Sequence, residues 1–310
     1  MKVVSALGAV RRLLDEGVVR PGDTLVDSSS GIYAYALALA CHRYGMGCYI
    51  VGSTTVDDAL RAQLAVLGAR LEQMEPSSDL KLDQSRRVRR IHEILRDNPA
   101  FHWMQQYHDD IHYLGYREVA ELIAEHLDVR RLTVVGGVGS GASTGALASF
   151  LREREPSVNL VGVQPFGSIT FGSEHVSDPE IIIAGIGSSI PFGNVAHDLY
   201  DTIHWIAFDA ALAGSVDLLR RHAIFAGLST GAGYLAARWE RSRAPDQTVL
   251  FIAADTGHRY VESVFARHHE AVRIEELAPH RVATVEELAL PWSRMRWDRA
   301  PAPTAAVAVG

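Results

Sequence analysis

The glycine-rich run at residues 136–145, GGVGSGASTG, has the clearest capacity for chemistry in this chain. It follows an apolar run at 132–135 and precedes a helical pattern. A turn between a strand and a helix directs backbone N–H groups at one point, and the helix N-terminus adds partial positive charge. We therefore expect this turn to hold a phosphate. Simple packing of helix against strand is the alternative, and a dinucleotide is disfavoured because VGVQ at 161–164 ends without an acid for a ribose.

Two serines in this sequence fit the G-x-S-x-G pattern of a nucleophile elbow. Ser143 lies in GASTG at 141–145, and Ser229 lies in GLSTG at 227–231. Histidines follow both copies, as a catalytic triad requires. Because the chain has fourteen histidines, that observation hardly distinguishes a hydrolase from another protein. A serine hydrolase therefore stays open as an alternative.

A second anion-binding turn is predicted at residues 27–31, DSSSG, between a short strand pattern and a helix. Serine hydroxyls and free N–H groups at a helix start suit a carboxylate, although plain capping of the helix explains part of the run.

Histidine and cysteine spacing gives no comparable signal. His108 and His112 could share one helix face, and His268 lies near Glu270, but neither pair has a third convergent ligand, so no metal site is predicted. The two cysteines are predicted to be buried free thiols, because their spacing fits no common metal or redox pattern. They are Cys41 and Cys48.

Hydrophobic periodicity places these turns in an α/β protein with two lobes, each a mostly parallel sheet covered by helices. Strands are predicted at 24–26, 48–51, 132–135, 159–163 and 249–252, and helices at 4–14, 33–42, 56–67, 79–96, 117–126, 208–219 and 231–239. The charged helix at 79–96 is predicted to separate the last strands of the first lobe. The segment 167–200, rich in Gly, Ser and Pro, is predicted to be a functional loop. The predicted domains are 1–112, 113–299 and a disordered tail at 300–310.

Composition limits the function classes. The 310 residues are 47% apolar and 22% charged, enough to bury a core without metals or disulfides. A net charge of −7 removes the usual electrostatic basis for binding nucleic acid or an anionic membrane. Neither a run of 18 apolar residues nor a signal peptide is encoded, so we expect a cytoplasmic protein with neither of these partners.

In their order along the chain, these segments resemble the fold-type II pyridoxal-phosphate enzymes, particularly the cysteine synthase group, its tryptophan synthase β-like relatives and the enzymes that make diaminopropionate precursors. The resemblance covers nearly the whole chain. It is carried by the helix, Pro-Gly-Asp turn and strand at 4–26, SSGIYA at 29–34, QQY at 105–107, GSGAS at 139–143, GVQP at 162–165 with Gly167-Ser168, GIG at 185–187, GLSTGA at 227–232 and DTGHRY at 255–260.

The resemblance implies a bound pyridoxal 5′-phosphate and assigns residues to it. Lys2 stands where the family has the lysine that forms the Schiff base, and the other lysine, Lys81, lies in a charged stretch. The implied cofactor residues are Gly139, Ser140, Gly141, Ala142 and Ser143 at the phosphate, Thr256 at the ring nitrogen, and Ile32 where the family has an asparagine beside the phenolic oxygen. The implied substrate residues are Ser29, Ser30, Gly31, Gln106 and Gly185.

The implied activity is β-replacement on an O-activated serine-type amino acid, with sulfide, a thiol or an amine as nucleophile. Lys2 would take the Cα proton while the pyridine ring delocalises the charge. The resemblance also implies a homodimer. A β-eliminating lyase is one alternative. An inactive relative that binds a ligand or a partner is the other, because Ile32 removes a polar contact and Lys2 lies so near the first residue.

The family has strands ahead of its lysine, whereas Lys2 is the second residue here. We expect a true start farther upstream, a partner chain that covers this end, or a loss of catalysis.

Overall fold

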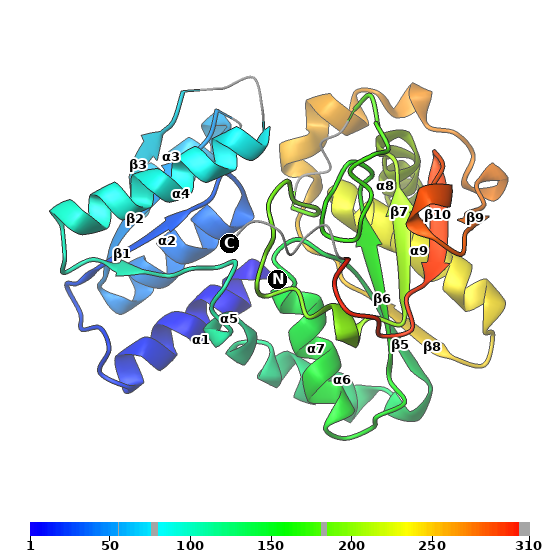
Figure 1. The fold of residues 1–310 in the computed structure, drawn as a ribbon, viewed down its shortest axis with the longest axis horizontal. Coiled ribbons are helices and arrows are strands. Elements are labelled where there is room, and N and C mark those ends of the chain that lie inside the picture. The colour runs from blue at the N-terminus through cyan, green and yellow to red at the C-terminus, as the bar shows by residue number, and fades with distance from the viewer. Residues whose placement is uncertain (55, 76–79, 181–184, 304–310) are drawn as a thin grey trace. The chain divides into compact units, whose positions relative to one another are not determined.

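The computed structural model describes residues 1–54, 56–75, 80–180 and 185–303. It divides the chain into two compact units (Figure 1): Lys2–Tyr116 form the first unit, and Met1 with Arg117–Gly310 form the second. Each unit has its own sheet with helices packed on it. The predicted two-lobed α/β class is confirmed. The domain boundary predicted at 112 lies just before the end of the first unit at Tyr116.

The first unit alternates helices and strands. Its elements are α1 (Lys2–Asp15), β1 (Thr24–Ser28), α2 (Ile32–Tyr44), β2 (Gly47–Gly52), α3 (Asp58–Val66), β3 (Arg70–Gln73), α4 (Leu80–Asp97), β4 (His102–Trp103) and α5 (Ile111–Leu114). The strands lie in the order β3-β2-β1-β4, and every pair is parallel. The charged helix α4 joins β3 to β4, as predicted.

Alternate residues of β1 and β2 face two different helix layers. Leu25 and Ile50 pack with apolar residues of α1, α2 and α3. Val26 and Val51 pack with Ile91 and other residues of α4. Helix α2, which joins β1 to β2, covers one face of the sheet, and α4, which leads to β4, covers the other. Since β2 and β4 lie on opposite sides of β1, the strand order reverses between β1 and β4. In open parallel sheets, ligands bind beyond the carboxyl ends of the strands at such a reversal.

The second unit has a larger sheet. Its helices and strands are α6 (Arg117–His126), β5 (Leu132–Gly137), α7 (Ala142–Arg152), β6 (Asn159–Gln164), β7 (Thr202–Ile206), α8 (Phe208–His222), α9 (Leu228–Arg243), β8 (Thr248–Phe251), β9 (His280–Arg281) and β10 (Trp292–Arg296), with short 3₁₀ turns and one π-helical turn at Val261–Phe265 between them. The strand order is β8-β5-β6-β7-β10-β9, with β10 antiparallel to β7. Val135, Val161 and Val163 pack against α8 and α9. This sheet reverses its order between β5 and β8.

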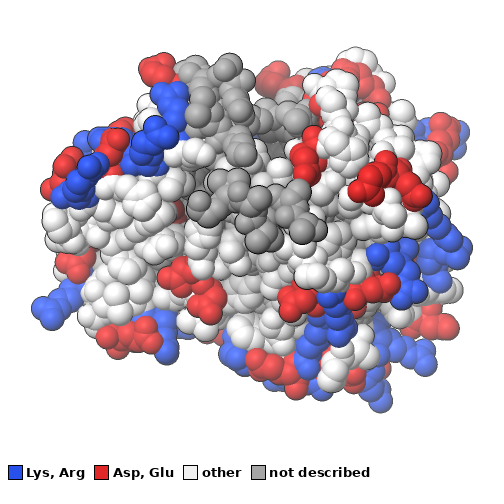
Figure 2. Space-filling view, in the orientation of Figure 1, with Lys and Arg blue, Asp and Glu red and all other residues white. Residues whose placement is uncertain are grey.

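The loop predicted at 167–200 is irregular wherever it is described, apart from a 3₁₀ turn at His197–Leu199. The tail predicted to be disordered at 300–310 lies mostly outside the described residues, and Ala300 O accepts a hydrogen bond from Trp297 Nε1. No helix of the described chain has both the length and the apolar character needed to cross a bilayer. On the face drawn in Figure 2, acidic and basic side chains are interspersed.

Candidate functional site

The loop between β1 and α2 presents two serine hydroxyls at the carboxyl edge of the first sheet. Ser29 Oγ accepts hydrogen bonds from the backbone N of Ala34 at 3.1 Å and of Gly31 at 3.4 Å. Ser30 Oγ accepts from Ser53 N at 2.6 Å. A hydroxyl that accepts through its lone pairs keeps its hydrogen for donation. Both serines are therefore held in place as donors beside the positive end of α2, which is an arrangement suited to a carboxylate.

Gln106 joins the carboxyl ends of β4 and β1. Its Nε2 donates to Ser28 O at 2.7 Å, and its backbone N donates to Asp27 Oδ2 at 3.0 Å. The structure thus places Gln106 beside the serine loop, and its predicted contact with a substrate carboxylate stays a prediction. The observed bonds of its side-chain amide and backbone fix the shape of that loop.

Asp27 is a buried carboxylate at the same strand end, with 1% of its surface exposed. It also accepts hydrogen bonds from Ser28 N at 2.7 Å and from Trp103 Nε1 at 3.2 Å. Burial raises the pKa of Asp27 to about 6, although these N–H donors and Lys2 act in the opposite direction. In the sequence, Asp27 stands out only as the start of the turn at 27–31. The signal was an acid at the end of a buried strand.

Lys2 is the first residue of α1 and is partly buried. Burial lowers the pKa of its ammonium from 10.5 to about 8, while the charge of Asp27 raises it. Its Nζ lies 5.9 Å from the centre of the Tyr33 ring. A desolvated lysine of this kind is a stronger nucleophile near neutral pH than an exposed one, because more of it is uncharged.

His112 points into the first unit rather than toward a metal position. Its ring Nε2 lies 2.8 Å from Met104 O and 3.5 Å from the Tyr33 hydroxyl, and burial lowers its pKa to about 4. Within the described residues, no group of three His, Cys, Asp or Glu side chains could hold a metal ion.

Arg87 of α4 is a further residue at this strand end, one that no sequence motif indicates. It is 8% exposed, and its Nε donates to Ser28 Oγ at 3.0 Å. The available signal was its spacing, because Arg87 precedes Ile91 and Ile94 on one helical stripe. The arginine therefore supports the strand end that carries the serine loop.

The glycine-rich turn of the second unit follows β5 and leads into α7. Gly141, the residue before α7, has a φ of 81°, and a Cβ there would lie 2.5 Å from Asn194 O. A Cβ at Gly139 would overlap Gly185 O. Only glycine therefore fits these two positions. The first N–H groups of α7 have no partner within the helix, so the turn can present them to an anion.

Two further hydrogen bonds hold this turn in place through the carbonyl of Val138. Val138 O accepts from Gln164 Nε2 at 2.6 Å and from Gly187 N at 2.9 Å. The turn is therefore tied both to β6 and to the segment that includes Gly185.

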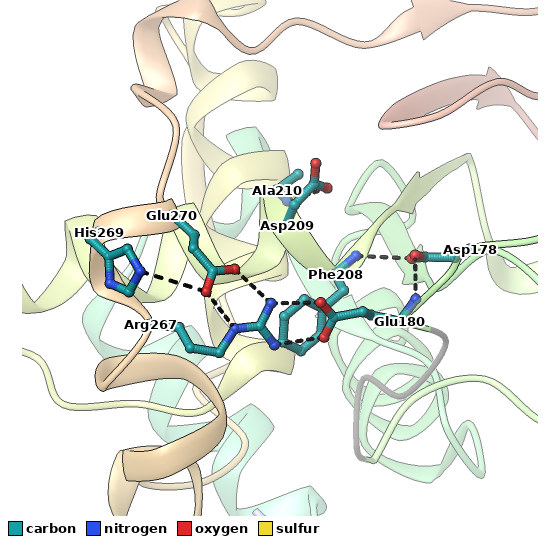
Figure 3. A network of polar contacts seen from close by, with 8 residues as sticks. All are labelled: Asp178, Glu180, Phe208, Asp209, Ala210, Arg267, His269 and Glu270. Atoms are coloured by element: carbon teal, nitrogen blue, oxygen red, sulfur yellow. Dashed lines mark hydrogen bonds and ion pairs between the residues drawn. The ribbon is translucent and has the colours of Figure 1, made fainter.

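A network around Arg267 anchors Asp178 and Glu180 of the segment 167–200 (Figure 3). Arg267 donates to both carboxylate oxygens of Glu180, at 2.6 and 2.7 Å, and to both of Glu270. Asp178 Oδ2 accepts from Phe208 N at 3.0 Å, at the start of α8. These bonds connect the loop to α8 and to the 3₁₀ turn His268–Glu270.

Thr256 follows β8, on the other side of the sheet reversal from the glycine-rich turn. It is exposed, and its Oγ1 lies 3.1 Å from His258 Nδ1. The neighbouring Asp255 accepts from the Tyr260 hydroxyl at 2.8 Å, and burial raises its pKa. Since the ends of β5 and β8 meet at one sheet edge, the second unit brings Thr256 and the glycine-rich turn to the same edge.

The serine-hydrolase alternative fits this geometry poorly. Ser143 is the second residue of α7, and Ser229 is the second residue of α9. A nucleophile elbow places its serine at the turn between strand and helix.

Cys41 and Cys48 are buried free thiols, as predicted. A hydrogen bond with Cys41, together with burial, raises the pKa of Cys48. A thiol in this state is a poor nucleophile.

Comparison with known proteins agrees with this geometry. Residues 1–255 match the model of the family described as pyridoxal-phosphate dependent enzyme. The chain is 30% identical to N-(2-amino-2-carboxyethyl)-L-glutamate synthase of Ralstonia nicotianae over 262 aligned residues. The aligned region covers 83% of this chain and 75% of that relative. It is 24% identical to cysteine synthase B of Campylobacter jejuni, over 84% of this chain and 85% of the relative.

Among solved structures, the crystal structure of O-ureido-L-serine synthase superposes with a TM-score of 0.74 at 25% identity, covering 84% of this chain and 82% of the other. The family match spans most of the sequence and includes both sheet reversals. The chain therefore belongs to the family of pyridoxal-phosphate dependent enzymes, with the fold of its type II, tryptophan synthase β-like members.

Proposed function

We propose that this protein catalyses β-replacement on a small amino acid of the serine type whose side-chain oxygen is activated as a leaving group. The observation that carries the proposal is Lys2, a partly buried amine with a lowered pKa at the start of α1. Relatives named as a carboxyethyl-glutamate synthase, a cysteine synthase and an O-ureidoserine synthase support the reaction class.

The residues present fit pyridoxal phosphate. Lys2 offers an amine that can attack an aldehyde. The glycine-rich turn offers helix N–H groups in a backbone shape that a side chain at Gly139 or Gly141 would fill. Thr256 offers an uncharged hydroxyl suited to a ring nitrogen that carries no proton. We assign the cofactor aldehyde to Lys2, its phosphate to residues 139–143, and its ring nitrogen to Thr256.

Different side chains of this protein then bind the substrate carboxylate and accept the α-carbon proton. Ser29, Ser30 and the N–H groups around Gly31 bind the substrate carboxylate, and Gln106 keeps this loop in shape. Lys2 Nζ, when uncharged, accepts the proton of the substrate α-carbon. Pyridoxal phosphate supplies the electron sink for the charge that develops there.

We also propose that the protein is a homodimer in the cytoplasm. The dimer is supported by the family resemblance alone. The cytoplasm is supported by two thiols that remain free, as is usual in a reducing compartment. Light scattering of the purified protein tests the dimer, which a monomeric mass would contradict.

The protonation of Lys2 predicts how cofactor capture depends on pH. The rate at which pyridoxal phosphate attaches to the cofactor-free protein should rise with pH and level off above about 8, because only the uncharged amine attacks the aldehyde. Asp27 raises the pKa of Lys2, so Asp27→Asn should move the midpoint to lower pH. Stopped-flow absorbance measures both rates. Identical midpoints in the two proteins would remove Asp27 from this role.

The glycine-rich turn predicts a second effect. Gly139→Ala should weaken pyridoxal phosphate binding by about tenfold or more, because the added Cβ overlaps Gly185 O and displaces the turn by more than a hydrogen bond tolerates. Equilibrium dialysis gives the dissociation constant. Gly233→Ala in α9 is the matched control, since a Cβ there meets nothing within 4 Å. Equal losses in both variants would contradict the assignment.

The decisive experiment supplies purified, cofactor-loaded protein with O-acetylserine or O-phosphoserine, with and without sulfide or an amino acid nucleophile. Mass spectrometry should find a new β-substituted amino acid only when a nucleophile is present. Rapid pyruvate formation without any nucleophile would indicate elimination instead. A loaded protein that leaves both substrates unchanged would contradict catalysis on this substrate class.

A further inference from the structure

Tyr33 places a phenol beside the amine of Lys2. The tyrosine lies in the first turn of α2 and is 3% exposed. Lys2 Nζ lies 5.9 Å from the centre of its ring. A phenol oxygen lies roughly 3 Å from the centre of its own ring, given ordinary covalent bond lengths. Any molecule attached to Lys2 therefore begins close to this side chain.

The hydrogen bonds of His112 show that the phenol of Tyr33 does not donate its proton to that ring. His112 Nε2 lies 2.8 Å from Met104 O, a carbonyl that only accepts, so Nε2 carries the hydrogen. The same nitrogen lies 3.5 Å from the Tyr33 hydroxyl, which can therefore only accept from it. The hydroxyl hydrogen of Tyr33 is therefore not donated to His112.

The phenol stays protonated over the working range of pH. Burial, followed by nearby groups that disfavour a second negative charge, holds the pKa of Tyr33 well above 10. The titratable and charged groups that surround it are Asp27, Cys41, Cys48, Tyr107, His112 and Lys2. Tyr33 is therefore a fixed donor in this environment.

The chemistry of pyridoxal phosphate supplies an acceptor at this place. Its aldehyde carbon and its phenolic oxygen are attached to neighbouring ring atoms, so a donor beside the lysine has that oxygen within reach. The preceding residue, Ile32, has an aliphatic side chain that offers no hydrogen bond. We propose that Tyr33 donates a hydrogen bond to the phenolic oxygen of the cofactor held by Lys2, an inference that rests on the proposed function.

This bond has two measurable consequences. It contributes to cofactor affinity, and it draws negative charge away from the oxygen that helps to retain a proton on the Lys2 nitrogen. Removing it should therefore weaken the binding of pyridoxal phosphate by about tenfold and raise the pH midpoint of the visible absorbance band by about one unit.

The test compares wild type, Tyr33→Phe and Tyr35→Phe, each loaded with pyridoxal phosphate. Tyr35 is a matched control, because it lies on the same helix and is only partly buried. Equilibrium dialysis gives the dissociation constant, an absorbance titration gives the midpoint, and thermal unfolding without cofactor reports folding. Both shifts are expected in Tyr33→Phe and neither in Tyr35→Phe, with similar unfolding temperatures.

The outcomes separate this inference from the proposed function. If wild type binds no pyridoxal phosphate, both are overturned. If wild type binds it and Tyr33→Phe matches wild type in affinity and midpoint, only the role of Tyr33 is overturned. A loss that also occurs in Tyr35→Phe would assign the effect to packing of α2 and would likewise contradict it.

Discussion

Replacing Lys2 by alanine should reduce the turnover of cofactor-loaded protein by about a thousandfold, since a positioned base contributes 10²–10⁴ and no second amine is expected to replace it. The same change should remove the visible absorbance that follows the addition of pyridoxal phosphate, because alanine has no amine to bind the aldehyde. Borohydride reduction of the wild type followed by digestion and mass spectrometry should find the cofactor on the N-terminal peptide.

Lys81→Ala is the matched control for this experiment, because the chain has only these two lysines. It should retain the absorbance, the borohydride adduct and the turnover of wild type. An adduct on Lys81 in the wild type, or full absorbance in the Lys2→Ala variant, would show that Lys2 does not hold the cofactor.

The largest effect on stability is expected from Glu240→Ala in the second unit. Glu240 Oε1 lies 2.9 Å from His204 Nε2 and 2.7 Å from Arg294 Nε, and Trp292 Nε1 donates to His204 Nδ1 at 2.9 Å. This network joins α9 to β7 and β10. Truncation leaves a mostly buried guanidinium and a fully buried imidazole without their acceptor, a type of change that costs about 3–5 kcal/mol. For a unit of this size, the unfolding temperature should fall by roughly 10 °C.

Differential scanning calorimetry tests this prediction. Glu153→Ala removes the partner of Arg117 from an exposed pair and should leave the unfolding temperature nearly unchanged. If Glu240→Ala and Glu153→Ala unfold at the same temperature, the buried network does not stabilise the second unit.

Acid provides a further readout for Glu240. Burial raises its pKa, but the hydrogen bonds from His204 and Arg294 prevail and lower it from 4.5 to about 2. A carboxyl group whose pKa is lower in the folded than in the unfolded state stabilises the protein fully above the unfolded value. Its contribution should therefore be lost between about pH 4.5 and pH 2, and Glu240→Ala should lack that part of the acid dependence.

Much of the fold followed from local patterns. The helix and strand patterns from residue 4 to 67 and the turn at 136–145 correspond to α1, β1, α2, β2, α3, β5 and the start of α7. Strands that local patterns did not reveal are short or unusual. β4 has two residues, β3 is partly exposed, and the sequence TIHWI of β7 is buried throughout and lacks alternation. Neighbouring strands stabilise these segments, and that information is not local.

The sequence by itself determined the two turns that can hold anions, because glycine and serine act on the backbone of their own neighbours. The sequence also pointed to Lys2 as the candidate cofactor lysine, through its resemblance to a family. Only the tertiary structure decided the environment of that lysine and of Asp27. Asp27 and Gln106 are 79 residues apart and meet only because β1 and β4 are neighbours in the sheet. The pKa values, the support from Arg87 and the orientation of Tyr33 all depend on this order, because burial and hydrogen bonding are set by which segments pack together.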